Sequence, residues 1–375
     1  MTDPLRHASV PEARERVLSL VMPLPAEDRP LAGAWGACLA APVAASGPMP
    51  PFDNAAMDGY AVLAADAGAG LPPAARPIAT GQRLPAGADA VVPIERVSDE
   101  RISGPVRPGD HVRRRGEEFA AGVTLLAAGE PLSPPAIGLL AGMGLQAVRV
   151  HRQPRVAVLV SGDELLPIAR RAPDELIPDA NGPMLGALLA AAGARLTEVC
   201  CVPDDRETIR AALERLSADA DLVCTSGGAS VGRPDHLIGL VAELGRLHLH
   251  QLAVKPGRPT SFGTIGRTPV VVLPGNPFAL LAGFELIARP VVRRLAGAAD
   301  PLRARVTLAA AEPMPGDAAR TLVVAVRVDG SRVRPLAGAG AAMLSGVARA
   351  DGLAFLPPGG GVPAGRTVEV ELWPR

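Results

Sequence analysis

The chain has 375 residues, and its 38 Lys and Arg residues balance its 38 Asp and Glu residues, so the formal net charge is zero. At roughly 100 to 200 residues per domain, this length predicts two to four domains. Hydrophobic residues make up 48% and charged residues 20%, which excludes an intrinsically disordered chain. The charge balance argues against sequence-independent binding of nucleic acid, because that binding requires an excess of Lys and Arg.

The cysteines and the N-terminal segment indicate the compartment. The four cysteines, Cys38, Cys200, Cys201 and Cys224, lack CxxC spacing and are too few for a disulfide scaffold. The first residues, MTDPLRHASVPEARERV, are charged where a signal peptide would be apolar, and no later run of about 18 residues is apolar and uncharged. We therefore expect a cytoplasmic protein that does not enter a membrane.

The N-terminal part of the chain predicts a helix followed by a small β domain. Ser9 to Glu12 forms a capping-box pattern with Pro11 in the first turn, and the apolar pattern continues to Met22. From Leu24 to about Gly122, Pro and Gly interrupt short Val-containing runs, which is typical of a small β domain. A second helix is then predicted from Pro134 to Gly142, and a short strand from Ala147 to Val150.

After a predicted boundary at Gln153 and Pro154, apolar strand runs alternate with helices, the pattern of a parallel sheet wound on both faces. The predicted strands are Val156 to Val160, Glu198 to Val202, Asp221 to Thr225, Leu247 to Val254 and Pro269 to Leu273. The predicted helices are Pro183 to Ala192, Arg206 to Ser217, Asp235 to Leu244 and Phe278 to Leu295. After Gly297 a second small β domain is predicted, with strands at Arg305 to Ala309, Thr321 to Val328 and Thr367 to Leu372.

Three Gly-containing segments follow strands of the predicted sheet. They are SGDEL from Ser161 to Leu165, SGGASVGRPDH from Ser226 to His236, and LPGNP from Leu273 to Pro277. In wound α/β sheets, ligands bind beyond the carboxyl ends of the strands, where backbone N–H groups and helix N-termini attract anions. A single loop of this kind can be a turn with a purely structural role. Three of them on one edge of a sheet favour a phosphate-binding site.

Carboxylates gather on the same edge. Asp163, Glu164, Asp204, Asp205 and Asp235 all follow strands, and carboxylate oxygens are hard ligands that could hold a divalent cation on a phosphate-bearing ligand. The alternative is helix capping, because Asp204, Asp205 and Asp235 stand just before helices. Asp163 and Glu164 have no equally obvious capping role.

Lys255 is the single lysine of the chain, in the segment LAVKPGRP at the end of a predicted strand. A compact ammonium suits a small oxyanion better than a planar guanidinium does, and Arg258 could add charge. The alternative is that the lysine is retained by chance or for packing.

A further unusual segment is PPFDNAAMDGYAV, Pro50 to Val62, which holds Asp53, Asp58 and the only tyrosine. It is too polar and too interrupted by Gly for a core strand, and the alternative to a functional role is a loop ordered by Asx turns.

The chain resembles a known family in its motifs. The segments PPFDNAAMDGYAV, TGQRLPAGADAVVPIE from Thr80, VRRRGEE from Val112, SGDEL, SGGASVGRPD, KPGRP and LPGNP occur in the order found in molybdopterin molybdenumtransferases of the MoeA type, the bacterial counterparts of the gephyrin E domain. The resemblance covers nearly the whole chain and weakens after about residue 300. It implies that the protein transfers molybdenum from molybdate to the dithiolene of adenylylated molybdopterin and releases AMP, with Mg2+ as the metal cofactor.

The resemblance also implies a multidomain α/β fold. The expected parts are a three-layer doubly wound molybdopterin-binding domain, small β domains and a C-terminal β-barrel-like domain. We expect a dimerisation and linker domain at 1–22 and 123–152, a small β-rich domain carrying Asp58 at 23–122, the molybdopterin-binding domain at 153–298 and the C-terminal domain at 299–375. An elongated homodimer is expected, with the active cleft between the wound domain of one subunit and the Asp58 region of the other.

The family's functional residues carry over by position. The expected catalytic set is Asp58, Glu118, Glu164, Asp204, Asp235 and Lys255, and the expected metal ligands among them are Glu164, Asp204 and Asp235. The expected substrate-binding set is Thr80, Ser161, Gly162, Asp163, Ser226, Gly227, Gly228, Ser230, Gly232, Pro256, Gly257, Arg258, Pro274, Gly275, Asn276, Pro277, Arg320 and Ser345. Two positions depart from the family: Glu118 stands where Asp is usual, and Gln251 where a second Lys is common.

Two other readings of the sequence stay open. The wound part alone also resembles molybdopterin adenylyltransferases and the binding domain of a nicotinamide-nucleotide deamidase family, although those enzymes lack the motifs before residue 150. A scaffold that binds receptor segments, as the gephyrin E domain does, is the non-enzymatic alternative, which the retained acids and Lys255 disfavour. The expected partners are adenylylated molybdopterin, molybdate, a second copy of the chain and a molybdopterin adenylyltransferase.

Overall fold

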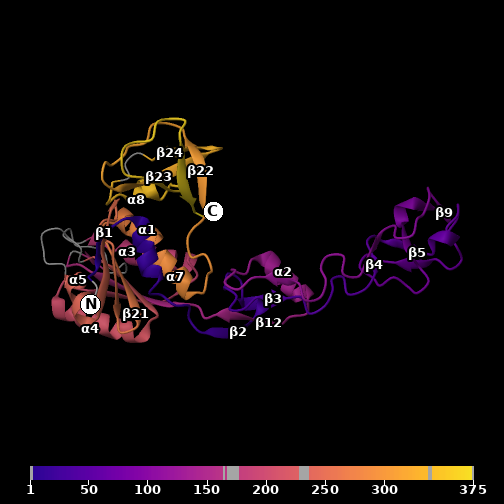
Figure 1. Cartoon of the computed structure of the whole chain (residues 1–375), viewed down its shortest axis with the longest axis horizontal. Coiled ribbons are helices and arrows are strands. Elements are labelled where there is room, and N and C mark those ends of the chain that lie inside the picture. The colour runs from indigo at the N-terminus through magenta and orange to yellow at the C-terminus, as the bar shows by residue number, and fades with distance from the viewer. Residues whose placement is uncertain (1–2, 164, 167–176, 228–235, 337–339, 374–375) are drawn as a thin grey trace. The chain divides into compact units, whose positions relative to one another are not determined.

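The computed structural model describes residues 3–163, 165–166, 177–227, 236–336 and 340–373. The chain divides into two compact units (Figure 1). The first unit comprises Met1–Glu27, Gly36–Ala40 and Val150–Arg375, and the second comprises Asp28–Trp35 and Ala41–Arg149. The division into four domains with the boundaries given above stays a prediction.

A seven-stranded sheet forms the centre of the first unit, in the order β1-β18-β20-β21-β17-β13-β16. Its strands are β1 (Leu5–Ala8), β13 (Arg155–Ser161), β16 (Arg195–Val202), β17 (Leu222–Ser226), β18 (Arg246–Leu252), β20 (Ser261–Ile265) and β21 (Thr268–Leu273). Strands β16, β13, β17 and β21 run parallel, which confirms the predicted wound core.

The expectation that the whole sheet is parallel was wrong. Strand β20 pairs antiparallel with both β18 and β21, so this side of the sheet is mixed. The sequence gives β20 little signal, because it is only five residues long and carries Gly263 in its centre. At that position a side chain would collide with Val241 and with the backbone of Arg246, so the strand requires a glycine there. Edge strand β1 was also not predicted, and it pairs parallel with β18.

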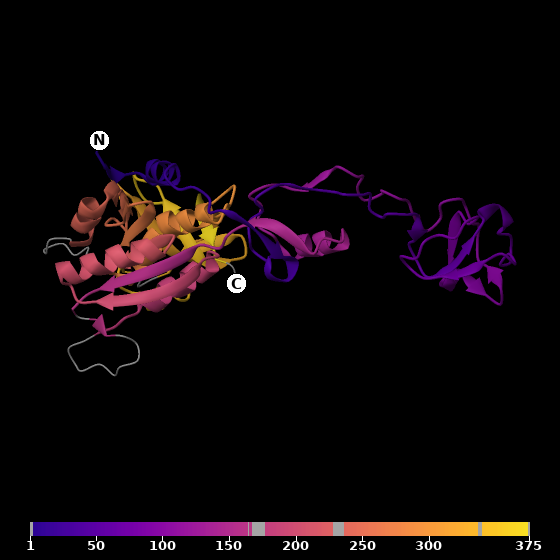
Figure 2. The ribbon, with the colours of Figure 1, turned by 90° about the horizontal axis from the view of Figure 1, so that it is seen from below.

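Helices cover both faces of the sheet (Figures 1 and 2). Helices α4 (Arg206–Asp219) and α5 (His236–Leu244) pack on the face formed by Ala157, Leu159 and Val223. The other face, formed by Val156, Val158 and their neighbours, is covered by α1 (Val10–Leu18), α3 (Asn181–Ala191), α6 (Pro277–Gly283) and α7 (Arg289–Leu295). The alternation of β13 side chains between the two clusters is the period-two pattern of a buried strand. This is the predicted three-layer arrangement.

The first and the last of the predicted helices differ from the prediction. Helix α1 ends at Leu18 instead of Met22. The long last helix, predicted as one piece, contains a π-helical turn at Phe284–Ala288 between α6 and α7. That turn places the acidic residue Glu285 in the core, where the guanidinium of Arg303 donates to both of its carboxylate oxygens at 3.0 and 3.2 Å.

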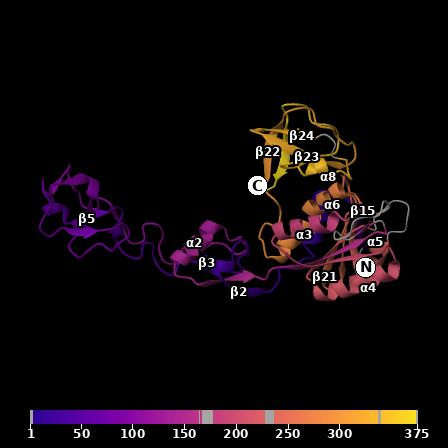
Figure 3. The same ribbon diagram turned by 180° about the vertical axis from the view of Figure 1, so that it is seen from behind.

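A closed five-stranded barrel forms the C-terminal part of the first unit, in the order β23-β24-β22-β26-β25 with β25 pairing back to β23. The strands are β22 (Arg305–Ala310), β23 (Thr321–Asp329), β24 (Arg332–Pro335), β25 (Gly352–Leu356) and β26 (Thr367–Leu372). Strands β24 and β25 were not predicted. The short strand β19 (Val254–Lys255) joins the barrel beside β23. Figure 3 shows the short helix α8 (Leu344–Val347) beside α6.

The second unit is built from short strands, as the sequence predicted. Its largest sheet has the order β6-β5-β7. The elements between residues 26 and 151 are β2 (Ala26–Pro30), β3 (Val43–Ala44), β4 (Asn54–Ala55), β5 (Gly59–Val62), β6 (Arg76–Ile78), β7 (Ala90–Pro93), β8 (Val97–Ser98), β9 (Arg101–Ile102), β10 (Val112–Arg113), β11 (Thr124–Leu126), α2 (Pro134–Gly142) and β12 (Ala147–His151). Among the described residues, no helix is long and apolar enough to cross a bilayer.

Candidate functional site

The Gly-containing segments after β13, β17 and β21 meet at the carboxyl ends of the strands. Gly227 has φ +103°, and a side chain there would overlap the backbone oxygen of Ser161. A Cβ added to Gly275 would lie 3.5 Å from the Cα of Gly227. Because all three backbones approach so closely, the predicted convergence of these segments on one edge is confirmed for their described residues.

Asn181, at the start of α3, holds two of these segments together. Its Nδ2 donates to the hydroxyl oxygen of Ser226 at 2.9 Å and to the backbone oxygen of Gly275 at 2.6 Å. Asn181 is buried, and its Oδ1 has no hydrogen-bond partner among the described residues. We had not predicted this residue, although it is one of only three asparagines in the chain.

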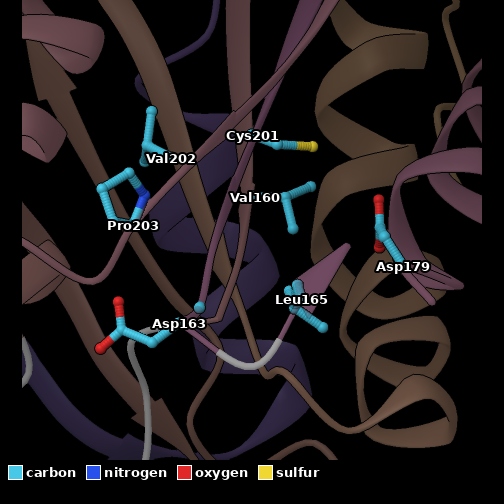
Figure 4. Close-up of a pocket in the computed structure, with 8 residues that line it drawn as sticks. Val160, Asp163, Leu165, Asp179, Cys201, Val202 and Pro203 are labelled. Atoms are coloured by element: carbon cyan, nitrogen blue, oxygen red, sulfur yellow. The ribbon is translucent and has the colours of Figure 1, made fainter. Parts of the chain in front are cut away.

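A cavity of about 240 Å³ opens beside the same edge (Figure 4). Strands β13 and β16 and the strand β14 (Leu165–Leu166) contribute to its wall. The residues that line it are Val160, Gly162, Asp163, Leu165, Asp179, Cys201, Val202 and Pro203. Cys201 is exposed as a residue on edge strand β16. Partial desolvation of its sulfur, followed by the nearby charge of Asp179, raises the pKa of the thiol, so it stays protonated at neutral pH.

The carboxylates after β16 have different roles. Asp205 is the N-cap of α4, and hydrogen bonds from the hydroxyl and the N–H of Thr208 lower its pKa, which confirms the capping alternative for this residue. Asp204 is not the cap. Its N–H donates to Oδ1 of Asp163 at 2.9 Å, and its own Oδ1 is buried with no hydrogen-bond partner in the described part of the chain.

Several predicted residues lie outside the described residues. They are Glu164, Gly228, Ser230, Gly232 and Asp235. Of the three predicted metal ligands, the structure therefore describes only Asp204. Within the described ranges no group of three His, Cys, Asp or Glu side chains is arranged to hold a metal ion. Ser161 and Gly162 lie at the end of β13, and the hydroxyl of Ser161 is buried without a partner among the described groups.

Lys255 lies where the sheet edge meets the barrel. Strand β19 carries it into register with Leu322 of β23, and its side chain is 58% exposed. Its Nζ lies 3.8 Å from Oδ2 of Asp317, and the same carboxylate accepts from Arg320 at 2.8 Å. The Arg320 guanidinium, with the N–H of Ala319, lowers the pKa of Asp317 to about 2. The structure thus brings together Lys255 and Arg320, two of the predicted site residues, around an acid that the sequence analysis did not single out.

The residues that flank Lys255 are fixed in other ways. Pro256 follows a cis peptide bond, and the backbone oxygen of Gly257 accepts from the N–H and hydroxyl of Thr260. The Arg258 Nε donates to Oε1 of Gln251 at 3.2 Å, so Gln251, at the position where the family commonly has a second lysine, contacts another predicted site residue.

The segment before α6 is only partly open. Pro274 is buried, Pro277 is half-buried, and Gly275 and Asn276 are exposed. The first free N–H groups of α6, those of Phe278 and Ala279, donate to the backbone oxygen of Ala341 at 3.0 and 3.4 Å. This helix N-terminus is therefore already occupied by a carbonyl, which leaves Gly275 and Asn276 as the exposed part of the segment. Ser345 is exposed on α8.

In the second unit, Asp58 is an exposed acid next to Thr80. The N–H of Thr80 donates to Oδ1 of Asp58 at 2.6 Å, and this bond, together with one from the Thr80 hydroxyl, lowers the pKa of Asp58. Glu118 is also exposed, and its N–H donates to the backbone oxygen of Met49. Asp53 accepts from the backbone of Arg115 and from the guanidinium of Arg114, at 2.7 and 2.8 Å, so it orders its loop.

Three family models together match most of the chain. Residues 8–144 match the MoeA N-terminal region (domain I and II), residues 157–294 a probable molybdopterin binding domain, and residues 307–373 the MoeA C-terminal region (domain IV). Molybdopterin molybdenumtransferase 2 of Mycobacterium tuberculosis is 36% identical over 308 residues, which cover 73% of this chain and 76% of the relative. The chain belongs to the molybdopterin molybdenumtransferase (MoeA) family.

Other relatives of the MoeA family agree with this assignment. Molybdopterin molybdenumtransferase of Haemophilus influenzae is 33% identical over 66% of this chain and 68% of its own length. The crystal structure of the molybdopterin biosynthesis MoeA protein from Pyrococcus horikoshii matches with a TM-score of 0.80 and 29% identity, over 98% of this chain and 99% of that one. The resemblance inferred from the motifs is thus confirmed, and it extends through the C-terminal barrel, where the motifs were weakest.

Proposed function

We propose that this protein inserts molybdenum from molybdate into adenylylated molybdopterin, with release of AMP and formation of molybdenum cofactor. Membership of the MoeA family supports the molybdenum transfer. The observation that carries the proposal to particular residues is the convergence of Ser161, Gly227 and Gly275 at one sheet edge. Strand β18 ends at the same edge, shortly before Lys255. Backbone N–H groups and hydroxyls at such an edge suit the pyrophosphate of the substrate.

The residues of this edge have distinct proposed roles. Ser226 accepts a hydrogen bond from Asn181, so its own O–H is free to donate to a phosphate oxygen. Lys255 and Arg320 attract molybdate, a small dianion, and hold it near the end of the substrate that carries the dithiolene. The two sulfurs then displace oxygen from molybdate, which leaves as water with the protons of the dithiol, and a water molecule cleaves the pyrophosphate link to give AMP and the phosphate-bearing cofactor.

Mg2+ is the metal that we propose for this site, with Glu164, Asp204 and Asp235 as its ligands. The buried Oδ1 of Asp204, which has no partner among the described residues, fits a hard cation that prefers oxygen ligands. The metal would neutralise charge on the pyrophosphate, while Asp163, bonded to the N–H of Asp204, keeps the Asp204 backbone in place.

We also propose a cytoplasmic homodimer in which Asp58 and Glu118 of one subunit complete the site of the other. The support for this comes from the family resemblance and from the exposure of both side chains. Thr80 holds the Asp58 carboxylate, and the backbone N–H of Glu118 donates to Met49. Contact with a molybdopterin adenylyltransferase is proposed on the same ground, because the adenylylated substrate must be supplied by such an activity.

The function is tested by reconstitution with purified components. The protein is incubated with adenylylated molybdopterin, Mg2+ and molybdate, and AMP and active cofactor are both measured. We expect both products to appear together and to require molybdate. An adenylyltransferase would instead consume ATP and molybdopterin, and a scaffold would give neither product.

A further inference from the structure

The cavity beside the carboxyl edge is too small for a whole substrate. Its volume is about 240 Å³, below the range of about 300 to 1,000 Å³ that is common for sites enclosing an entire drug-sized ligand. It therefore fits one ring system. Its walls are apolar at Val160, Leu165 and Val202, which suits the faces of a flat heterocycle.

The charges of the described lining residues disfavour a phosphate group in the cavity. None of its described lining residues is a cation, and two of them, Asp163 and Asp179, are acids. Figure 4 shows these two carboxylates on opposite sides of the cavity, with Val160 and Leu165 between them, so they do not converge on one point as metal ligands would. The cavity thus suits an uncharged ring with hydrogen-bond donors along its edge.

Asp179 is the group that would recognise such an edge. It is only 5% exposed, and its position is fixed at the start of α3 by the N–H groups of Asn181 and Gly182, which donate to its Oδ1 at 2.9 and 3.0 Å. Within the described part of the chain, Oδ2 receives only a longer contact of 3.2 Å, from the N–H of Gly182. Because an ionised carboxylate offers about four acceptor positions and no donor, the side facing the cavity still accepts.

We propose that this cavity binds the 2-amino-4-oxo-pyrimidine ring of the pterin, with Asp179 accepting hydrogen bonds from its 2-amino and N3–H groups. This assignment rests on the proposed function, which supplies the pterin as the ligand. Those two donors lie side by side, so both can be directed at Oδ2, the oxygen that the backbone amides of α3 leave more open. Adenine presents a ring nitrogen acceptor beside its amino group, which a carboxylate repels, so the adenylyl end of the substrate binds elsewhere.

The test compares two fluorescent probes that differ at the edge in question. Pterin carries the 2-amino group, and lumazine has an oxo group there. We expect the wild-type protein to bind pterin about tenfold or more tightly than lumazine, as is common when one edge of a base is read by two hydrogen bonds. In Asp179→Asn, which can still accept from the α3 amides, pterin binding weakens by about tenfold or more and the preference over lumazine disappears.

Asp205→Asn is the matched control. Asp205 also caps a helix, and it does not line the cavity, so this variant should keep the preference for pterin. AMP binding should be unchanged in Asp179→Asn. The assignment is overturned if folded Asp179→Asn keeps the preference, or if it loses AMP binding instead of pterin binding.

Equal affinity of the wild-type protein for the two probes overturns the assignment without any variant, so it can be refuted even if Asp179→Asn fails to fold. These binding measurements need no molybdenum. A protein that discriminates pterin from lumazine and transfers no molybdenum would refute the proposed function alone. One that transfers molybdenum without this discrimination would refute the cavity assignment alone.

Discussion

Lys255 and Arg320 face one carboxylate, that of Asp317, at the point where the sheet edge meets the barrel. With a pKa of about 2, Asp317 is ionised at every pH at which the enzyme would work. It can therefore hold the two cations in place while their remaining donors attract an oxyanion. Arg320 is held at 2.8 Å, whereas Lys255 is 3.8 Å away and largely exposed, so Lys255 is the more available of the two.

Removal of the Lys255 ammonium should raise the requirement for molybdate. One charge-assisted hydrogen bond contributes about 1.5 to 3 kcal/mol, so we expect Lys255→Ala to need roughly ten to a hundred times more molybdate for half-maximal product formation. Pterin and AMP binding should stay unchanged. Lys255→Arg should restore the affinity only in part, because the guanidinium has a different shape and reach.

Arg332→Ala is the control for this loss of charge. Arg332 is exposed on β24 and pairs with Asp329 at the far end of β23, roughly 23 Å along the strand from the register of Lys255. The control should leave the molybdate dependence unchanged. An unchanged dependence in Lys255→Ala would instead show that the lysine is present by chance or for packing.

Asn181 stabilises the edge through its side-chain amide. Asn181→Asp removes both donated hydrogen bonds and places a carboxylate against the oxygens of Ser226 and Gly275, so we expect a loss of about 1 to 3 kcal/mol in the free energy of unfolding. Urea denaturation measures this loss. Asn276→Asp, at an exposed position whose side chain makes no cap bond, should change stability by less than about 0.5 kcal/mol. Equal effects of the two variants would contradict the role of Asn181.

The motifs predicted the glycine-containing loops at the sheet edge, but they did not predict the side chains that hold these loops in place. Ser226, Gly227 and Gly275 were predicted, because glycine and serine after a strand are typical of phosphate loops. Asn181 and Asp179 were not, because they lie on a separate segment that only the fold brings to the edge. Asp317 was missed for the same reason.

At the scale of single elements, the loop after β17 depends on one glycine. Gly227 has φ +103°, where an L side chain is strained by about 1 to 3 kcal/mol, and a Cβ there would also collide with Ser161. We expect Gly227→Ala to reduce the free energy of unfolding by at least this amount and to weaken AMP binding. Thermal denaturation and AMP titration measure the two effects.

Gly138→Ala is the matched control for that substitution. Gly138 lies within helix α2, and a Cβ at this position would have no atom within 4 Å. Since alanine is the better helix former, stability should be unchanged or rise by up to about 1 kcal/mol. Stability losses of the same size at positions 138 and 227 would show that the close approach to Ser161 is unimportant.

The sequence predicts elements where the pattern is strong and local. Strands β13, β17 and β21 are continuous apolar runs, and α4 has a capping residue and an amphipathic pattern, so all four were found near their true positions. Strands β20, β24 and β25 are only four or five residues long. Such strands are stabilised by pairing with distant segments, which a local pattern does not reveal.

For the whole molecule, we expect complementation between subunits. Asp58 and Lys255 lie in different units of the chain, and we propose that each active site takes one from each subunit. Asp58→Asn and Lys255→Ala proteins, each of low activity alone, should regain part of the wild-type activity when mixed under conditions that exchange subunits. A mixed dimer would contain one intact site.

A second mixture is the control for that experiment. Asp58 and Glu118 both lie in the second unit, so every site of a mixed Asp58→Asn and Glu118→Gln dimer would contain one altered residue. This mixture should show no recovery. Recovery in neither mixture despite verified exchange, or a strictly monomeric protein in solution, would contradict the shared site.

The claim that the protein is a molybdenum-inserting enzyme is tested most directly by the stoichiometry of its products. Purified protein is given adenylylated molybdopterin, Mg2+ and increasing molybdate, and AMP and active molybdenum cofactor are measured in the same samples. We expect one active cofactor for each AMP released, with both rising together as molybdate is added. AMP release that continues without molybdate and yields no active cofactor would contradict it, because the protein would then be a hydrolase of the adenylylated compound.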